Sequence, residues 1–452
     1  MIFVLAVTAL IAAEAPPDDT LQSAPETLGQ QLFHDTRFSN PRGDMETSCA
    51  SCHMRSDPLG YRAFTEALSH SWHPWRNEDP SREALRNTPT LLDLADHPLI
   101  HFDGEFHSLE EQARKTLVGR NFGWLPSEKQ TALDHIYAAI HAQDASQSYR
   151  ERFLTDYTID IDSLDRVQLV NAMGNAIADF VRSLRSENTS SYDRFLTLNK
   201  IDPAPKPGEG PKGYGTRLLE EMAKNEEEGT LRLPEAFSPL ALEGYKTFLR
   251  TTGRDQAGNC VACHVPPTFT DFTFHNAGVT QDIYDGAHGE GSFTALAIPS
   301  DPNTPRPMKK FLSISSRKRP GHVDLGHWNY AKFGASPLYR AQDSESAFLE
   351  RTIATFKTPT LRNLAATDPY MHDGGYVTLE EALDLKIRAA FLARMGQLRN
   401  PDPELEHIHI FEDDIPALFA FLNALNDAGR RVAAPSKMPL SASGTLSSRY
   451  SP

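Results

Sequence analysis

The pentapeptides CASCH (residues 49–53) and CVACH (residues 260–264) contain all four cysteines of this 452-residue chain. The spacing C-x-x-C alone is compatible with a disulfide, a redox dithiol or half of a zinc site. The histidine that follows each pair points elsewhere, because C-x-x-C-H is the attachment pattern of c-type haem: both thiols add to vinyl groups, and the imidazole reaches the iron. The two copies predict two covalent haems, with structural zinc as the alternative. The predicted attachment residues are Cys49, Cys52, Cys260 and Cys263, and the predicted proximal ligands are His53 and His264.

Composition sets the class of protein. Hydrophobic residues make up 39% of the chain, which is long enough for two domains rather than one ordinary core. The net charge is −15 and there is no basic run, so nucleic acid is not an expected partner. An acidic surface suits a basic protein partner, or it serves solubility alone.

The N-terminus resembles a secretory signal. The apolar stretch 2–13 is shorter than the roughly 20 residues that cross a bilayer, and Ala13-Glu14-Ala15 has the small-x-small form of a cleavage site. A basic n-region is missing. Residues 1–15 are therefore predicted to direct export to the periplasm or beyond, and no later segment predicts a membrane span.

A second repeat relates two halves of the chain. Residues 88–112 read TPTLLDLADHPLIHFDGEFHSLEEQ, and residues 358–382 read TPTLRNLAATDPYMHDGGYVTLEEA. Both end in a capping box that predicts a helix start. The block begins 35 residues after His53 but 94 residues after His264, so the second half carries an insertion of about 59 residues. Its Gly, Pro and Ser content predicts loop between roughly 280 and 350.

The remaining pattern is mostly helical. Residues 167–184 and 415–425 have apolar residues at three and four spacing. The predicted organisation is an N-terminal domain at 16–201, a Pro- and Gly-rich connection at 202–234, a C-terminal domain at 235–432 and a disordered tail at 433–452.

The order CxxCH, TPTL–DG–LEE, long helix, CxxCH, FKTPTLRN–PYMHDG–LEEA resembles the bacterial di-haem cytochrome c peroxidase and MauG superfamily over residues 28–427. The resemblance implies a mainly α fold with two helical cytochrome c-like domains, each holding one covalent haem. It implies a peroxide-reactive N-terminal haem, an electron-transfer C-terminal haem and a calcium ion between them. The implied calcium ligands are Asn87 and the carbonyl groups of Thr367 and Pro369, and oxygen ligands of this kind suit calcium.

The chain departs from the family near the N-terminal haem. Phe102 stands where a tryptophan relays electrons, and Phe122 stands where a glutamate moves the peroxide proton, whereas the family glutamine is present as Gln112. Acid–base help from such a carboxylate contributes about 10²–10⁴ in rate. Three residues nearby in sequence are either substitutes or structural: Arg120, Trp124 and His107.

More than one residue could serve as the sixth ligand of each iron. Family members place a methionine or tyrosine fourteen residues after the histidine of PYMHDG, and here that position is Lys386. The rival is Met395, which a continuous helix would turn by about 900° and so present on the opposite face. The loop SHSWHPW (residues 69–75) offers His70 and His73 to the N-terminal haem.

The resulting functional expectation is an exported oxidoreductase that reacts with hydrogen peroxide. An electron-donor protein, such as a small cytochrome or a cupredoxin, would supply electrons through the C-terminal haem. Two alternatives stay open: a MauG-like enzyme that oxidises residues of a partner protein, and a di-haem electron carrier without catalysis. The resemblance leaves a homodimer open as well.

Overall fold

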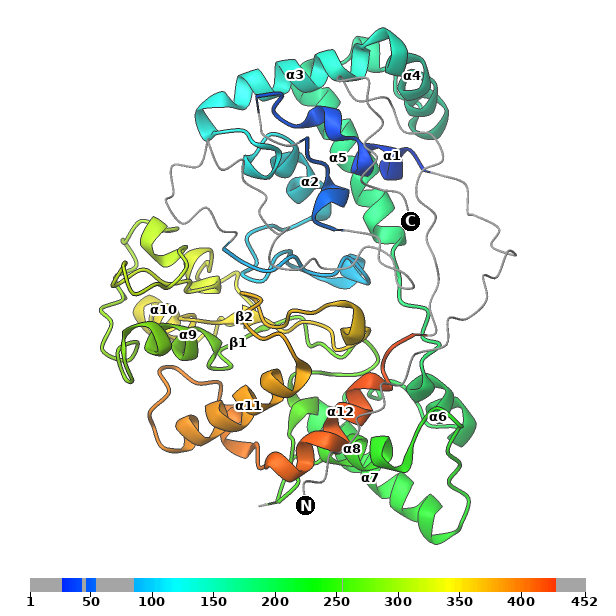
Figure 1. Ribbon diagram of the computed structural model, residues 1–452, viewed down its shortest axis with the longest axis vertical. Coiled ribbons are helices and arrows are strands. Elements are labelled where there is room, and N and C mark those ends of the chain that lie inside the picture. The colour runs from blue at the N-terminus through cyan, green and yellow to red at the C-terminus, as the bar shows by residue number, and fades with distance from the viewer. Residues whose placement is uncertain (1–26, 43–45, 54–84, 254, 428–452) are drawn as a thin grey trace, which may run out of the picture.

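The computed structural model describes residues 27–42, 46–53, 85–253 and 255–427. The predicted signal peptide, the predicted tail and the candidate ligands His70 and His73 lie outside these residues. The described part is mainly helical, as predicted (Figure 1). None of its helices is both long and apolar enough to cross a bilayer.

One group of helices, at the top of Figure 1, packs around α5. The α5 helix begins after Asp165, whose carboxylate accepts hydrogen bonds from two backbone N–H groups of its first turn, and its apolar face packs against α1 and α2. The helix predicted at 167–184 is thus confirmed. This group comprises α1 (Leu28–His34), α2 (Leu109–Leu117), α3 (Lys129–His141), α4 (Gln143–Tyr157) and α5 (Arg166–Ser183).

A second group packs around the pair α8 and α12, at the opposite end of the molecule (Figure 1). The helix predicted at 415–425 is confirmed as α12. This group comprises α6 (Ser191–Asn199), α7 (Pro211–Glu227), α8 (Pro239–Leu249), α11 (Leu379–Arg394) and α12 (Ile415–Asn423).

The two groups use the same helix crossing. A Cβ at Gly29 of α1 would lie 1.9 Å from the carbonyl oxygen of Ala176 in α5, and a Cβ at Gly244 of α8 would lie 1.9 Å from that of Ala417 in α12. Only glycine permits this approach of one backbone to the other. The repeat seen in the sequence therefore extends to the helices that frame each half.

The segment 202–234 differs from the predicted connection. It contains the 17-residue helix α7, whose Tyr214, Leu218 and Met222 are buried in the second core. Apolar residues at helical spacing outweigh the Pro and Gly of residues 203–210, which end before α7 begins. This segment is part of the second core, although the domain boundaries themselves stay a prediction.

The insertion is mostly turns, as predicted, except at its ends, where α9 (Val279–His288) and α10 (Glu345–Arg351) lie. It has a small core of its own, which includes Phe293, Phe311 and Trp328. Packing against itself lets a Gly- and Pro-rich segment keep a defined shape without long helices.

The halves meet at a seam beside the only strand pair in the described residues, β1 (Phe274–His275) with β2 (Phe356–Lys357). The Lys357 N–H donates to the carbonyl of Phe102 at 2.7 Å, and the Asn87 N–H donates to the carbonyl of His372 at 2.8 Å. Arg86 pairs with Asp103 of the first half and with Asp324 of the insertion. The segment before α2 thus rests on the second half.

Candidate functional site

The first pentapeptide begins with a 3₁₀ turn, Cys49–Ser51, that the Ser48 N–H caps by donating to the Ser51 hydroxyl at 2.9 Å. The His53 N–H donates to the carbonyl of Cys49 at 2.9 Å, so the backbone makes one tight turn from the first cysteine to the histidine. Burial lowers the pKa of His53 to about 4, so the ring is neutral, the state that ligates iron. Its Nδ1 is buried and makes no hydrogen bond to a described residue.

The second pentapeptide repeats this geometry. Its 3₁₀ turn is Cys260–Ala262, and the His264 N–H donates to the carbonyl of Cys260 at 2.8 Å. The Nδ1 of His264 lies 3.0 Å from the carbonyl of Phe269, an arrangement that fixes the tautomer and leaves Nε2 for a metal. Burial lowers the pKa of this histidine to about 4 as well.

Both pentapeptides fit a c-type haem. All four cysteines are free of disulfides and partly buried, and burial raises the pKa of Cys49 and of Cys260 to about 12. Such apolar surroundings suit a porphyrin edge better than a charged zinc–thiolate site. The two pairs belong to different hydrophobic cores, so one four-cysteine zinc site does not fit them.

Each half also contains a DG turn: the first DG turn is residues 100–106, and the second is residues 370–376. Each is closed by an antiparallel bridge, between Ile100 and Phe106 and between Tyr370 and Tyr376. Gly104 of the first turn has φ +72°, and a Cβ there would lie 2.7 Å from the ring of Phe274. The sequence repeat therefore builds the same turn twice.

Residues implied by the family resemblance lie around the first DG turn. Phe102 is partly buried at the seam, where its carbonyl accepts from Lys357. The Nε2 of Gln112, in α2, donates to the Thr116 hydroxyl at 3.0 Å. Phe122 is buried in the first core, where it carries no acid–base group.

The three suggested substitutes are not equivalent. Trp124 is 2% exposed, and its indole N–H donates to the carbonyl of Phe38 at 3.3 Å, so it is part of the first core. His107 is exposed. Arg120 is exposed but lies near Glu105 and Tyr330, whose charges act on it.

Sequence reasoning missed a pair in the first DG turn. His101 Nδ1 lies 3.4 Å from the Glu105 carboxylate, and each side chain is about one-third exposed, at 33% and 32%. His101 also acts on the pKa of His53, so the pair lies close to the first pentapeptide. Burial raises the pKa of Glu105, but His101 and Arg120 outweigh burial and lower it. The turn at residues 100–106 brings the two side chains together, and no short sequence motif marks the pair.

The structure separates the two candidate ligands of the second haem. Lys386 is partly buried in α11, and burial lowers the pKa of its amine to about 8. Its charge acts on Cys260 and His264, which places it beside the second pentapeptide. Met395 caps the end of α11 with 58% of its side chain exposed. The two residues thus differ in burial, and Met395 lies just beyond the last residue of α11.

Two of the three suggested calcium ligands are in contact across the seam. Asn87 Nδ2 lies 2.6 Å from the carbonyl oxygen of Pro369, and Thr367 is two residues away. The Oδ1 of Asn87 accepts a hydrogen bond from the Thr88 N–H at 2.9 Å, so in this structure the amide presents its N–H₂ end to the carbonyl of Pro369.

A second missed cluster adjoins Cys263. His275 lies between two carboxylates, with Nε2 2.8 Å from Asp271 and Nδ1 2.5 Å from Asp402. Burial alone would lower the pKa of His275, but the carboxylates raise it to about 12, so the ring is an imidazolium. The cluster therefore places charge beside the second pentapeptide. Asp402 is 127 residues from His275 in sequence, so no motif connects them.

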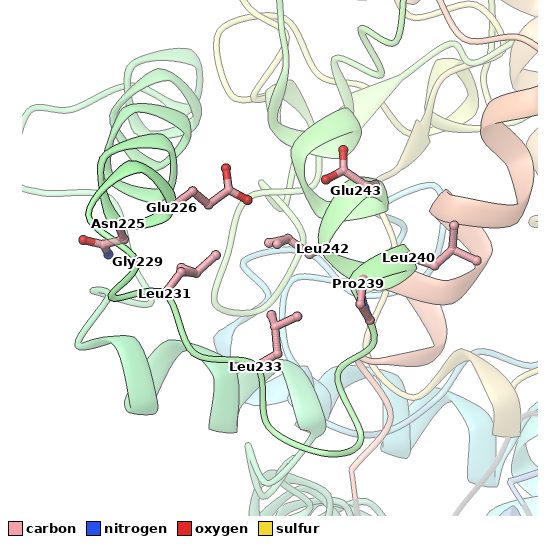
Figure 2. Close-up of a pocket in the computed structure, with 9 residues that line it drawn as sticks. All are labelled: Asn225, Glu226, Gly229, Leu231, Leu233, Pro239, Leu240, Leu242 and Glu243. Atoms are coloured by element: carbon pink, nitrogen blue, oxygen red, sulfur yellow. The ribbon is translucent and has the colours of Figure 1, made fainter.

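A surface hollow of about 630 Å³ lies between the end of α7 and the start of α8 (Figure 2). Leucines 231, 233, 240 and 242 line it, and the carboxylates of Glu226 and Glu243 lie above them. None of the candidate site residues lines this hollow, so the hollow is separate from the candidate site.

Comparison with known proteins agrees with this architecture. The family model of the di-haem cytochrome c peroxidases matches residues 23–200. The cytochrome-c peroxidase IdrP2 of Denitromonas iodatirespirans is 26% identical over 441 residues, which cover 95% of this chain and 92% of that protein. The methylamine utilization protein MauG of Methylophilus methylotrophus is 24% identical over 426 residues, 93% of this chain and 88% of that one.

Among solved structures, the diheme peroxidase BthA of Burkholderia thailandensis superimposes with a TM-score of 0.54 at 19% identity. The superposition covers 90% of this chain and 87% of that one, and at this identity it supports the fold alone. The predicted fold class is confirmed. The chain is therefore similar over nearly its whole length to cytochrome-c peroxidases and MauG proteins, and its residues 23–200 match the family model of the di-haem cytochrome c peroxidases.

Proposed function

We propose that this protein is an exported di-haem oxidoreductase that reduces hydrogen peroxide. Two bound c-type haems would supply the redox chemistry, held through Cys49, Cys52 and His53 in the first half and through Cys260, Cys263 and His264 in the second half. The overall reaction takes two electrons and two protons and converts one hydrogen peroxide into two waters. A small cytochrome or a cupredoxin is the proposed donor protein. The observation that carries the proposal is the paired pentapeptide geometry, with a neutral buried histidine in each copy.

His101 and Glu105 are the proposed source of protons on the N-terminal side. They replace the carboxylate that Phe122 cannot provide, and their 3.4 Å separation lets one hold a proton for the other. The charges of Arg120 and Arg86 act with His101 to lower the pKa of Glu105. Gln112 and Tyr330 would orient peroxide or water near the same turn.

Lys386 is the proposed sixth ligand of the C-terminal iron. Its amine can ligate only when neutral, and burial favours that form. Met395 is not retained as a candidate, because its side chain is on the surface. Calcium bound by Asn87, Thr367 and Pro369 is proposed to join the halves.

A non-catalytic electron carrier is the second candidate function, because Phe102 and Phe122 remove both the relay tryptophan and the distal glutamate. A MauG-like oxidation of a partner protein is a variant of the first function, since it too begins with peroxide.

Adding one equivalent of peroxide to the fully ferric protein separates the enzyme from the carrier. The proposal predicts a new absorption and EPR spectrum, complete at one equivalent and reversed by two electrons from a reductant. Glu105→Gln should slow this change by about 10²-fold or more. Glu110→Gln is the control and should leave the rate unchanged, because the Glu110 carboxylate pairs with Arg182 in α5. An unchanged spectrum in the parent protein would establish the carrier.

A further inference from the structure

Lys357 is a buried lysine that reaches from one half of the molecule into the other. It lies in β2 of the second half, and only 7% of it is exposed. Its Nζ donates to the carbonyl of Leu99 at 2.7 Å, and its backbone N–H donates to the carbonyl of Phe102 at 2.7 Å. Both acceptors belong to the first half, beside the position of the missing relay tryptophan.

The amine of Lys357 forms no ion pair with any residue that the structure describes, and burial lowers its pKa to about 7. The nearest influence of opposite sign is Asp103, whose carboxylate accepts hydrogen bonds from Arg86 and from the Glu105 N–H. Asp324 is bound by Arg86 through both of its oxygens. A buried ammonium has three donors and needs a compensating anion, whereas a single carbonyl satisfies only one donor.

A second polar group near Lys357 also lacks a partner. His97 has a buried Nδ1 with no hydrogen bond to the described residues, and its ring lies edge-on to Phe272 with centroids 4.8 Å apart. Burial lowers the pKa of His97 to about 3, and the charge of Lys357 lowers it further. A neutral imidazole and a lysine amine thus lie near each other: His97 Nδ1 has no hydrogen-bond partner among the described residues, and Lys357 Nζ has only the carbonyl of Leu99.

We infer that Lys357, with His97 beside it, binds a carboxylate at the seam, and that this carboxylate is a haem propionate. The inference rests on the two haems of the proposed function, which would bring four propionates into a chain whose seam carboxylates are already bound. The bond would fasten the second half to a haem edge beside Phe102. Lys357 is therefore a positioning residue that ties haem potential to the docking of the two halves.

The test is the midpoint potential of each haem, measured by spectroelectrochemistry without peroxide. A cation beside a propionate favours the reduced haem. Lys357→Met and Lys357→Gln should therefore lower one haem potential by about 59 mV, a tenfold change in the reduction constant, and the haem that moves identifies the owner of the propionate. Lys357→Arg keeps the charge, so the reduction constant of each haem should stay within about threefold of the parent value. Haem content of two per chain establishes that each variant is folded.

Lys115→Met is the matched control, because this lysine is in the first half, is 58% exposed and makes a surface ion pair with Glu111. Its potentials should equal those of the parent. Unchanged potentials in a folded Lys357→Met or Lys357→Gln variant would overturn the inference, as would an equal shift in Lys115→Met. Because no peroxide is used, a di-haem protein that fails to react with peroxide would refute the proposed function and leave this test intact.

Discussion

In the first half of the molecule the DG turn carries His101 and Phe102, whereas in the second half the matching positions carry Met371 and His372. The backbone is the same in both, since His101 and Met371 have φ values of 70° and 67°. The first turn places an imidazole–carboxylate pair near a pentapeptide; the second stacks His372 on Phe356 with ring centroids 3.6 Å apart. The two halves thus share a frame, and the side chains at a few positions distinguish them chemically.

The shared frame can be broken at the helix crossings. Gly29→Ala and Gly244→Ala each force a methyl group against a backbone carbonyl, so each should cost about 3 kcal/mol of unfolding free energy or prevent folding. Chemical denaturation of the holoprotein measures the change. Gly286→Ala is the control: it lies in α9 with no atom within 4 Å of the added Cβ, and it should be neutral or stabilising by about 0.5–1 kcal/mol. Equal effects at all three positions would contradict the account of the crossings.

The effect of calcium on stability tests whether a bound ion helps to hold the two halves together at the seam. At calcium a hundredfold above its dissociation constant, the ion should add about 2.7 kcal/mol to stability. Chelation should lower the melting temperature of the parent but not that of Asn87→Ala, which removes the side-chain ligand. A parent whose melting and metal content do not respond to chelation has no such site.

The second half should be distinguished by its nitrogen ligand. Lys386→Met should raise the potential of the C-terminal haem, with an increase of about tenfold or more in its reduction constant, because a thioether favours the reduced iron. The same variant should show a near-infrared sulfur-to-iron band. Met395→Ala should leave the parental spectrum unchanged. The assignment is wrong if Met395→Ala alters the spectrum and the Lys386 variant does not.

An indole at position 102 of the first half should make electron transfer between the haems faster. Phe102→Trp should speed electron transfer between the haems severalfold, because an indole is oxidised more readily than a phenyl ring. Flash photolysis or stopped-flow reduction measures the rate. Trp124→Phe should lower stability without slowing transfer, since Trp124 is packed in the first core. A slower transfer in Trp124→Phe would instead place that residue on the path.

The sequence predicted what depends on neighbours along the chain. The pentapeptides, the capping boxes at Ser108 and Thr378 and the helices at 167–184 and 415–425 all follow from local spacing. Helix α7 was missed because the Pro and Gly before it dominated the composition of its segment.

Features that depend on distant residues could not be predicted. The glycine crossings, the His275 cluster and the contact of Arg86 with Asp324, 238 residues away, need the packed structure. Even the His101–Glu105 pair, four residues apart, needs the turn that the bridge between Ile100 and Phe106 closes.

The central claim is that each half holds one covalent haem. The most direct measurement is the intact mass of protein from a host competent in cytochrome c maturation, combined with a pyridine haemochrome assay. The account predicts two haems per chain that resist acid–acetone extraction, and one haem in a variant with Cys260→Ala and Cys263→Ala. A colourless product, or zinc bound at the four cysteines, would contradict it.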